Sequence, residues 1–452
     1  MTHRILWASL LLGSMLSLAV SYSIAARSIL LGSREGHWVY GYIQSFSLVS
    51  LAVFLLVSAL SGALLAAPGA VAGRREWVLV LAWFLIAPGL QGLLRSLTPF
   101  TFESIFVSDG ANSFYSVARD YNAATVLSDF HRLLPSWPLH AQSNMPGKVM
   151  LVQALIHISR RPGVLAWLVV GISNLGGVLL YVFVRDLFAD RRVALFSLVL
   201  YFFVPAKLFF FPLLNTVTPV VVLACACLSL RWLATASVAY AALLGVALYG
   251  LVFYEPLPLV MGLLFSALTA RALWRADLTW RTFLLQSGLV VIAFAATYAT
   301  MFVWFGFDLI DALREIGVHA AAFNAVARRP YSIWVRQNLL DFLFGIGLCQ
   351  AVVFWIALGD GLAGGDVPHS RLTRPITVLC LALVAVLLAI DFIGVNRGEV
   401  IRLWIFLACF FQIPTAYVCA RLDNRAAITL VLVTALLQDA LGTSMIGFIV
   451  PG

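Results

Sequence analysis

Two aspartates, Asp109 and Asp120, are the residues best suited to catalysis, because they lie in a polar stretch, SDGANSFYSVARDY, of an otherwise apolar chain. A carboxylate within hydrogen-bond reach of an acceptor hydroxyl or amide can take its proton and act as a general base. We assign this role first to Asp109 and second to Asp120, with Asp129 a distant third. The alternative for Asp109 is structural, since an aspartate at the start of a helix accepts hydrogen bonds from backbone N–H groups.

Cationic side chains elsewhere in the chain could stabilise the negative charge that develops on a departing phosphate. Lys148 follows a Pro-Gly turn at the start of an apolar segment, where an ammonium group and free backbone N–H groups can meet an anion. The alternative for Lys148 is a lysine that extends to the lipid headgroups. The candidates for binding an anion are Lys148, Lys207, Arg329, Arg402 and Arg397, followed by Arg328.

Acidic and aromatic residues near these cations could bind a sugar or orient the cations. Glu399 lies three residues before Arg402, a spacing that allows an ion pair on one helix face. Glu255 lies at the end of a predicted span, where an isolated acid usually has a partner. We expect Glu255 to bind either sugar hydroxyls or a nearby arginine. The candidates for contacting a polar ligand or orienting the cations are Glu255, Glu399, Tyr331 and Tyr121.

No metal site and no cofactor are predicted. The sequence has no HExxH motif and no paired-cysteine spacing, and its six cysteines lie in apolar runs, as small buried hydrophobic residues do. The alternative is a divalent ion that bridges Asp109 and a donor phosphate. The sequence also lacks a glycine-rich phosphate-binding loop, so we expect no ATPase activity of its own.

The composition is that of an integral membrane protein. Hydrophobic residues make up 62% of the chain and charged residues 11%, against roughly 25% charged in soluble proteins. The net charge of +9 comes from short clusters between apolar runs, which membrane topology explains better than nucleic-acid binding. We predict an all-α polytopic fold with about 13 spans, at residues 5–31, 39–67, 77–98, 163–184, 193–212, 215–233, 237–253, 256–273, 283–305, 338–359, 375–394, 403–420 and 427–450.

These spans form one integral domain with two long loops. Residues 1–98 hold three amino-terminal spans, 163–305 the central spans and 338–452 the carboxy-terminal spans. The loops, 99–162 and 306–337, are predicted to lie outside. With the amino terminus inside, the short inner segments hold most of the arginines, as the positive-inside rule requires; they include Arg74, Arg75, Arg191 and Arg192.

Interfacial helices are predicted in both outer loops. From Ala111 onward, Phe114, Val117, Ala118, Tyr121 and Thr125 recur at helical spacing, which indicates a helix with one apolar face at the membrane surface. Residues 149–158 are apolar but too short to cross a membrane. In the second loop the apolar residues Leu313, Ile316, Gly317, Ala320 and Phe323 have the same helical spacing.

The order of these features resembles the GT-C superfamily of integral-membrane glycosyltransferases. The resemblance rests on an acid early in the first long outer loop, two interfacial helices, and a Pro-Gly turn that opens the second of them. Later segments are similar to bacterial polyprenol-dependent sugar transferases; they are 214–219 (LNTVTP), 254–256 (YEP), 329–331 (RPY) and 396–404 (NRGEVIRLW). Two features depart from the family pattern. The acidic loop follows the third span rather than the first, and no soluble carboxy-terminal domain is present.

The resemblance implies a GT-C-like fold and a function. Such enzymes transfer a sugar from a polyprenyl-phosphate donor to a lipid or glycan acceptor at the outer membrane face, in bacteria at the inner membrane, during assembly of the cell envelope or of glycolipids. Asp109 matches the position of the family's catalytic acid. The resemblance therefore implies that the cations named above bind the donor phosphate. It also implies that Glu255, Glu399, Tyr331 and Tyr121 contact or orient the sugar and acceptor. The expected partners are therefore the lipid-linked sugar, its acceptor and membrane lipids.

Two other classes of function stay open. A lipid or glycolipid transporter or flippase normally carries ionisable groups near mid-membrane, and the predicted spans have few. A glycopolymer ligase or polymerase of another fold would use similar lipid substrates and arginine-rich outer loops.

Overall fold

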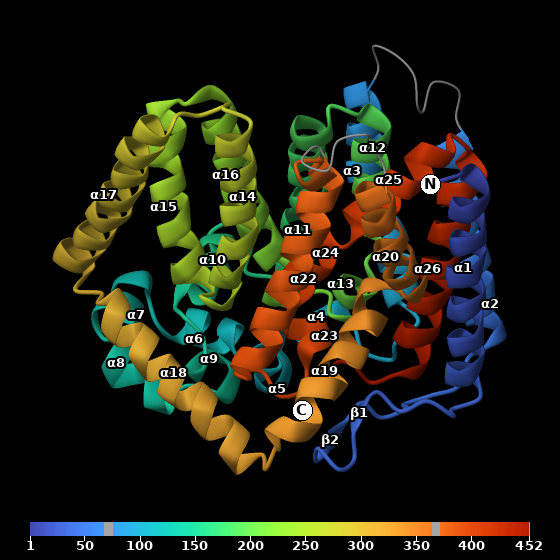
Figure 1. The fold of residues 1–452 in the computed structure, drawn as a ribbon. Coiled ribbons are helices and arrows are strands. Elements are labelled where there is room, and N and C mark those ends of the chain that lie inside the picture. The colour runs from blue at the N-terminus through green and yellow to red at the C-terminus, as the bar shows by residue number, and fades with distance from the viewer. Residues whose placement is uncertain (67–75, 364–370, 452) are drawn as a thin grey trace. The chain divides into compact units, whose positions relative to one another are not determined.

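The computed structural model describes residues 1–66, 76–363 and 371–451 (Figure 1). The chain is mostly helical and divides into two compact units. Unit 1 comprises residues 1–99, 173–211 and 329–448, and unit 2 comprises residues 100–172, 212–328 and 449–452. Arg74, Arg75 and the last residue of the predicted span 39–67 lie outside the described residues.

Unit 1 contains a short antiparallel hairpin and most of the long helices. Its strands are β1 (Gly32–Ser33) and β2 (Trp38–Val39). Its helices are α1 (His3–Ala25), α2 (Leu48–Ala66), α3 (Glu76–Arg95), α12 (Arg191–Phe202), α13 (Pro205–Phe209), α19 (Tyr331–Ile346), α20 (Leu348–Ala363), α22 (Pro375–Ile393), α23 (Val400–Leu403), α24 (Ile405–Phe410), α25 (Gln412–Leu422) and α26 (Arg425–Met445). The helix α11 (Pro162–Phe188) begins in unit 2 and ends in unit 1.

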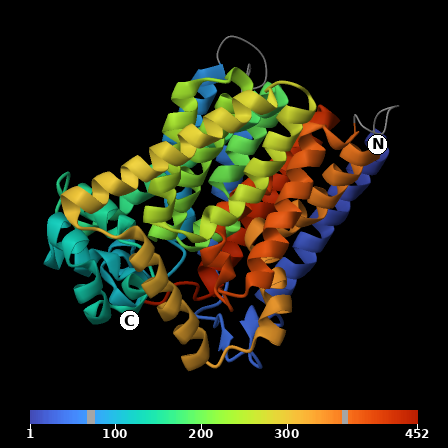
Figure 2. The same cartoon turned by 60° about the vertical axis from the view of Figure 1, so that its left-hand side comes forward.

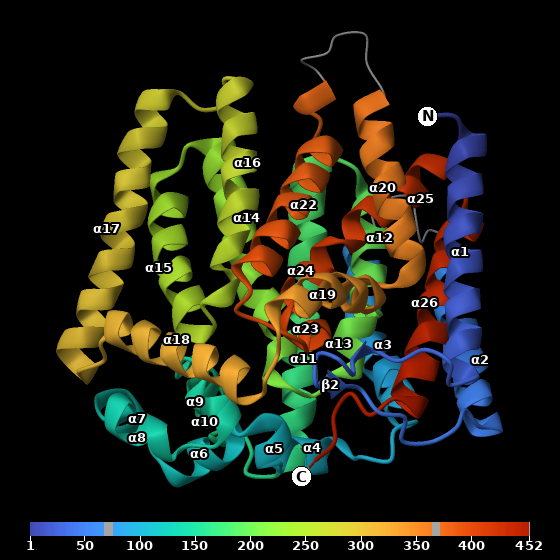
Figure 3. The ribbon, with the colours of Figure 1, turned by 60° about the horizontal axis from the view of Figure 1, so that its bottom comes forward.

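Unit 2 combines four long helices with a group of short ones. The long helices are α14 (Thr218–Thr235), α15 (Val238–Tyr254), α16 (Gly262–Trp274) and α17 (Trp280–Phe305), followed by α18 (Leu309–Val326). The short helices are α4 (Phe102–Val107), α5 (Asp109–Asn112), α6 (Phe114–Asp120), α7 (Ala123–Ser128), α8 (Phe130–Leu133), α9 (Leu139–Gln142) and α10 (Gly147–Ile156). Single 3₁₀ turns occur at Leu134–Ser136, Leu214–Thr216 and Leu257–Met261. Figure 3 shows the short helices gathered at one end of α15 and α17.

Eleven helical segments in the described part of the chain are long and apolar enough to cross a membrane, or up to 12 if a bent pair counts as one span. They coincide with eleven of the predicted spans, so the chain is a multi-pass membrane protein. The two other predicted spans differ in form. Residues 237–253 form the shorter helix α15, and residues 338–359 fall on α19 and α20, which meet at 97°.

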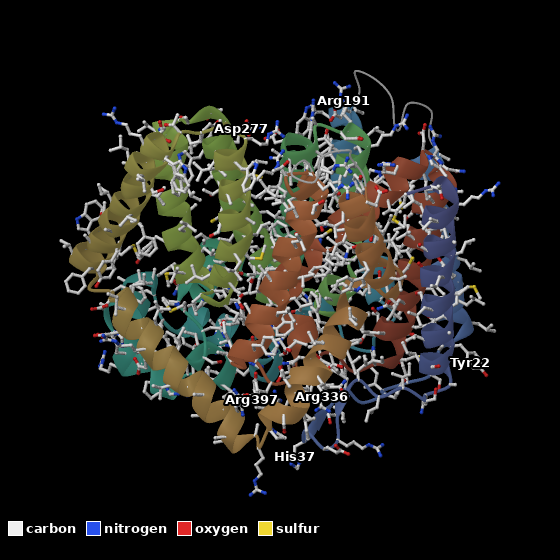
Figure 4. The ribbon with its side chains drawn as sticks, in the orientation of Figure 1. Tyr22, His37, Arg191, Asp277, Arg336 and Arg397 are labelled. Atoms are coloured by element: carbon white, nitrogen blue, oxygen red, sulfur yellow. The ribbon has the colours of Figure 1, made fainter. Side chains whose placement is uncertain are left out.

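Charged residues mark the two ends of the unit 1 helices. Arg191, predicted to be inside, and Arg397, predicted to be outside, lie at opposite ends of the unit 1 helices (Figure 4). Glu76 at the start of α3 forms ion pairs with Arg185 at 2.8 Å and with Arg191 at 3.1 Å. These contacts fix one end of three helices; which side of a membrane that end faces stays a prediction.

The first loop is helical, but not as the single helix that its spacing predicts. Phe114, Val117 and Ala118 are buried in α6 as expected. The helix is interrupted at Ser113, whose φ is 24°, and again at Tyr121, whose backbone is extended. Ser108 and Asn122 begin new helices by accepting backbone hydrogen bonds at 3.2 and 2.9 Å. The loop therefore folds as a compact group of short helices.

The second predicted loop contains one helix with a buried apolar face, and its placement at a membrane surface stays a prediction. α17 ends at Gly306, whose positive φ of 68° favours glycine. Asp308 then begins α18 by accepting from the N–H groups of Ile310 and Asp311. Figure 2 shows α18 leaving the end of α17 at a steep angle. Its buried residues include Leu309, Ala312 and Ile316, so its apolar face packs within unit 2.

The bend between α19 and α20 is held by a side chain from α26. Gln438 donates to the carbonyl of Phe344 at 2.6 Å and accepts from the N–H of Leu348 at 3.2 Å, one group on each side of Gly347. Gln412 also donates to the carbonyl of Ile346, at 2.9 Å. In a membrane no water replaces these partners, so a broken helix depends on such side chains.

We expect Gln438→Leu to lower the free energy of unfolding by about 1–3 kcal/mol, because it leaves the N–H of Leu348 without a partner and the Phe344 carbonyl with only its bond from the N–H of Gly347. Thermal unfolding in detergent measures the change. Gln142→Leu is the control, since Gln142 is only partly buried and donates a single bond, to Pro135. Equal shifts for the two variants would contradict the role given to Gln438.

Candidate functional site

Asp109 begins α5 in unit 2, with its carboxylate exposed. The structural alternative assigned it the capping of this helix, but the side chain that caps α5 is that of Ser108. Asp109 instead accepts a hydrogen bond from the hydroxyl of Ser116, one helix further along. Its carboxylate is thus oriented by one donor and still open to solvent, an arrangement that a general base requires.

The other acidic candidates of the first loop are engaged in ion pairs. Asp120 is exposed and accepts from Arg119 at 2.8 Å. This hydrogen bond is the main reason why the pKa of Arg119 is raised. Asp129 accepts from Arg132 at 2.5 Å. Tyr121 contributes its backbone carbonyl, which accepts from Gln153 at 2.6 Å; a contact of its ring with a sugar stays a prediction.

Lys148 is completely buried, and its ammonium lies 3.0 Å from the carboxylate of Glu255. Thr218 donates to the same carboxylate at 2.5 Å, and Lys148 also donates to Asn144 at 2.9 Å. The rings of Phe114 and Tyr254 lie within 6 Å of the ammonium. The protein partner of Glu255 is thus a lysine and not the expected arginine, and binding of sugar hydroxyls by Glu255 stays a prediction.

Gly147 makes this ion pair possible. A Cβ atom at Gly147 would lie 2.5 Å from the carbonyl oxygen of Phe253 and 2.6 Å from the Cα of Tyr254. The start of α10 therefore touches the end of α15 backbone to backbone, and the next residue on each side, Lys148 and Glu255, is brought to its partner. The Pro-Gly turn thus has a packing role, which its position in the sequence did not reveal.

Short contacts connect the Asp109 turn to this ion pair. A ring nitrogen of His140 lies 3.0 Å from the carbonyl of Gly110. Asn144 donates to the carbonyl of His140 at 2.7 Å and accepts from Lys148. α9 thus joins the turn that carries the exposed carboxylate to the buried pair, so the geometry of Asp109 depends on the packing around Lys148.

In unit 1, four of the predicted residues form one group, the arginine cluster (Arg329, Arg397, Glu399 and Arg402). Arg329 donates to Glu399 at 3.1 Å, and Arg402 donates to the other oxygen of the same carboxylate. Arg329 and Arg397 each donate to the other's backbone carbonyl, at 2.7 and 3.0 Å. Two guanidinium groups thus pair with one carboxylate, the third is joined to Arg329 through backbone carbonyls, and the cluster carries excess positive charge.

The loop before α23 gives the cluster its shape. Glu399 has a φ of 61°, uncommon for a residue with a side chain, and Gly398 has a φ of 87°. A Cβ at Gly398 would lie 2.9 Å from the Trp334 ring and 3.2 Å from Arg329. Tyr331 lies against Arg397, with 5.6 Å between the guanidinium and the ring centroid. Glycine is thus required at position 398, where the loop passes directly beside the Trp334 ring.

Two buried donors beside the cluster lack acceptors in the described part of the chain. Tyr40 is 4% exposed and its hydroxyl has no hydrogen-bond partner; the Nε of Arg402 has none either. Burial raises the pKa of the Tyr40 phenol well above its ordinary value, and the carboxylates of Glu399 and Asp341 raise it further. The positive charges of Arg402 and Arg329 lower it, but by less. Tyr40 therefore keeps its proton and remains a donor.

Lys207 bonds to a different set of residues from those of the arginine cluster. It is completely buried and donates to Asn174 at 2.8 Å, and the Tyr201 ring centroid is 4.0 Å from its ammonium. Asn174 is held in turn by Gln91. Within residues 1–66, 76–363 and 371–451 no carboxylate forms an ion pair with Lys207. Its role toward a phosphate stays a prediction.

The sequence interpretation missed the aromatic partners of the cluster. Trp38 lies over Arg329 at 5.1 Å, and Trp334 donates to the carbonyl of Gly36 at 3.1 Å. Residues 39–47 were assigned to a span, whereas the first helix after the hairpin begins at Leu48. The signal was present: Gly32 and Gly36 flank a polar turn, a pattern typical of a hairpin.

Among the residues that the structure describes, no group of three or more His, Cys, Asp or Glu side chains could hold a metal ion. Comparison with protein-family models gave no match for the chain, and a search of curated proteins gave none either.

Proposed function

We propose that this chain is a membrane glycosyltransferase that moves a sugar from a polyprenyl-phosphate donor to a lipid or glycan acceptor at the outer face of a bacterial inner membrane. Asp109 acts as the general base and the arginine cluster receives the donor phosphate. About 13 spans and interfacial helices in both outer loops belong to the same proposal. No metal is required, because guanidinium groups supply the positive charge.

The observation that carries this proposal is the pair of buried donors beside the cluster. Phosphate oxygens are acceptors that would satisfy both the Tyr40 hydroxyl and the Arg402 Nε. The planar guanidinium group of arginine can donate two parallel hydrogen bonds to a phosphate, and these charged hydrogen bonds are stronger than those from neutral donors. The side chains of Arg402 and Glu399 are 13% and 18% exposed, so the cluster is reached from outside the protein.

We expect Arg402→Gln to weaken binding of a polyprenyl phosphate by about 10- to 100-fold, since a hydrogen bond to a charged group is worth about 1.5–3 kcal/mol. Titration of the detergent-solubilised protein with the lipid phosphate measures this. Arg336→Gln is the matched control, because Arg336 is exposed on α19 in the same unit. Binding of the corresponding alcohol, which lacks the phosphate, should not change. Equal losses for both lipids would exclude phosphate recognition by Arg402.

The decisive assay offers the purified protein a panel of radiolabelled polyprenyl-phosphate sugars and follows release of the lipid phosphate. Release that depends on the donor sugar, and its absence in the Asp109→Asn protein, would support the proposal. Activity with nucleotide sugars alone would contradict it.

One observation favours a second function, a lipid or glycolipid transporter. Lys207 and Asp439 are buried within membrane-spanning segments, where ionisable groups often mark a transport path. The broken pair of α19 and α20 is also common in transporters. Movement of a labelled glycolipid across proteoliposome membranes without release of lipid phosphate, retained in Asp109→Asn, would identify this function.

A further inference from the structure

Asp439 is a buried acid inside the membrane-spanning helix α26. Its side chain is 0% exposed, and neither carboxylate oxygen has a hydrogen-bond partner among the residues that the structure describes. The other buried acids differ in this respect. Asp360 forms ion pairs with Arg421 and the amino terminus and accepts a hydrogen bond from Tyr417. Glu76 forms ion pairs with two arginines. Asp341 and Asp391 also accept hydrogen bonds.

No charge on the neighbouring helices compensates Asp439. α26 packs against α1, α2, α3, α13, α20 and α25. The charged residues of these helices are Arg4, Glu76, Arg95, Lys207, Asp360 and Arg421, and their other titratable groups are His3, Tyr22, Cys349, Tyr417 and Cys419. None of them forms an ion pair or hydrogen bond with Asp439 in the described ranges. An ionised carboxylate there would lack both water and a counter-charge, which a protein avoids by leaving the group neutral.

Thr443 lies one helical turn beyond Asp439, on the same face of α26. Its hydroxyl is also buried and has no partner in the described part of the chain. A carboxylic acid has one O–H to donate, and a threonine oxygen can accept it. A metal ion is a poor occupant, because hard cations take six or more oxygen ligands and this site offers one carboxylate and one hydroxyl.

We propose that Asp439 is a proton-binding site within the membrane-spanning bundle of unit 1, occupied at neutral pH. Occupation transfers one proton from water to one carboxylate oxygen and breaks no other bond. The site is independent of the glycosyltransferase proposal, since it uses none of the residues assigned to that reaction.

Dicyclohexylcarbodiimide, an apolar reagent for protonated carboxyls in membranes, tests this site in the full-length protein. The acid adds across the carbodiimide and rearranges to a stable N-acylurea, with no leaving group. Tryptic cleavage after Arg425 gives a peptide whose only acidic side chain is Asp439, and fragmentation by mass spectrometry locates the adduct. We expect labelling of Asp439 at pH 7 that declines as the pH rises, while Asp360, which is ion-paired, stays unlabelled.

The absence of label on Asp439 at pH 7 in monodisperse protein would overturn the proposal. Protection by sodium at constant pH would overturn it too, because the occupant would then be a metal cation. The wild-type measurement decides the main point, so the test does not depend on Asp439→Asn folding.

Discussion

Replacing Asp109 by asparagine should reduce sugar transfer by about 10²- to 10⁴-fold, the usual contribution of a general base. Asparagine keeps the size of the side chain and can still accept from Ser116, but it cannot take a proton from the acceptor. Binding of the lipid donor should not change, because the arginine cluster is untouched. Single-turnover assays with the donor that passes the radiolabelled screen measure both quantities.

The control for Asp109 is Asp311→Asn, in the same unit. Asp311 is also exposed and also paired, accepting from Arg314 at 3.0 Å, and we expect its replacement to leave turnover nearly unchanged. Asp120→Asn distinguishes the two acidic candidates. If Asp120→Asn abolished transfer and Asp109→Asn did not, the base would be Asp120 and the assignment to Asp109 would be wrong.

Lys148→Met should lower the free energy of unfolding by about 3–5 kcal/mol, because it leaves the buried carboxylate of Glu255 without its counter-charge. Both side chains are almost fully buried, with 0% and 7% exposed. The loss should therefore persist at high salt, where exposed ion pairs are screened. Chemical unfolding in detergent, at low and high ionic strength, measures it.

The double variant, Lys148→Met with Glu255→Gln, separates the pair from simple packing. It removes both charges and retains the bond from Thr218, so we expect it to recover most of the stability that Lys148→Met loses. Failure to recover would mean that the methionine itself does not fit between the rings of Phe114 and Tyr254. A Lys148→Met protein as stable as the wild type would exclude a structural role for the ion pair.

Span positions could be predicted well because they depend on local composition. A run of about 20 apolar residues is sufficient to form a crossing helix, and eleven predicted spans coincide with such helices. The bend at Gly347 could not be predicted in the same way. It depends on Gln412 and Gln438, residues remote in sequence that bond the broken backbone.

The candidate residues were predicted unevenly for the same reason. The Glu399–Arg402 pair was predicted from a spacing of three residues, and it forms. The partner of Lys148 was not predicted, because Glu255 comes from another helix and the contact requires the close approach at Gly147. Asp439 lies in a predicted span, where an isolated acid by itself indicates a special role. That no neighbouring helix in the described part of the chain supplies it with a counter-charge could be seen only from the packing of six helices around α26.

Glu399 sets a condition on any anion that the arginine cluster binds. Its carboxylate already pairs with Arg329 and Arg402, so an incoming anion competes with a tethered monovalent one. In the proposed reaction the donor is a phosphodiester with one negative charge, whereas the released polyprenyl phosphate is a monoester that can carry two. We therefore expect the cluster to bind the released phosphate more tightly than the donor, so that its affinity follows the charge that develops as the sugar departs.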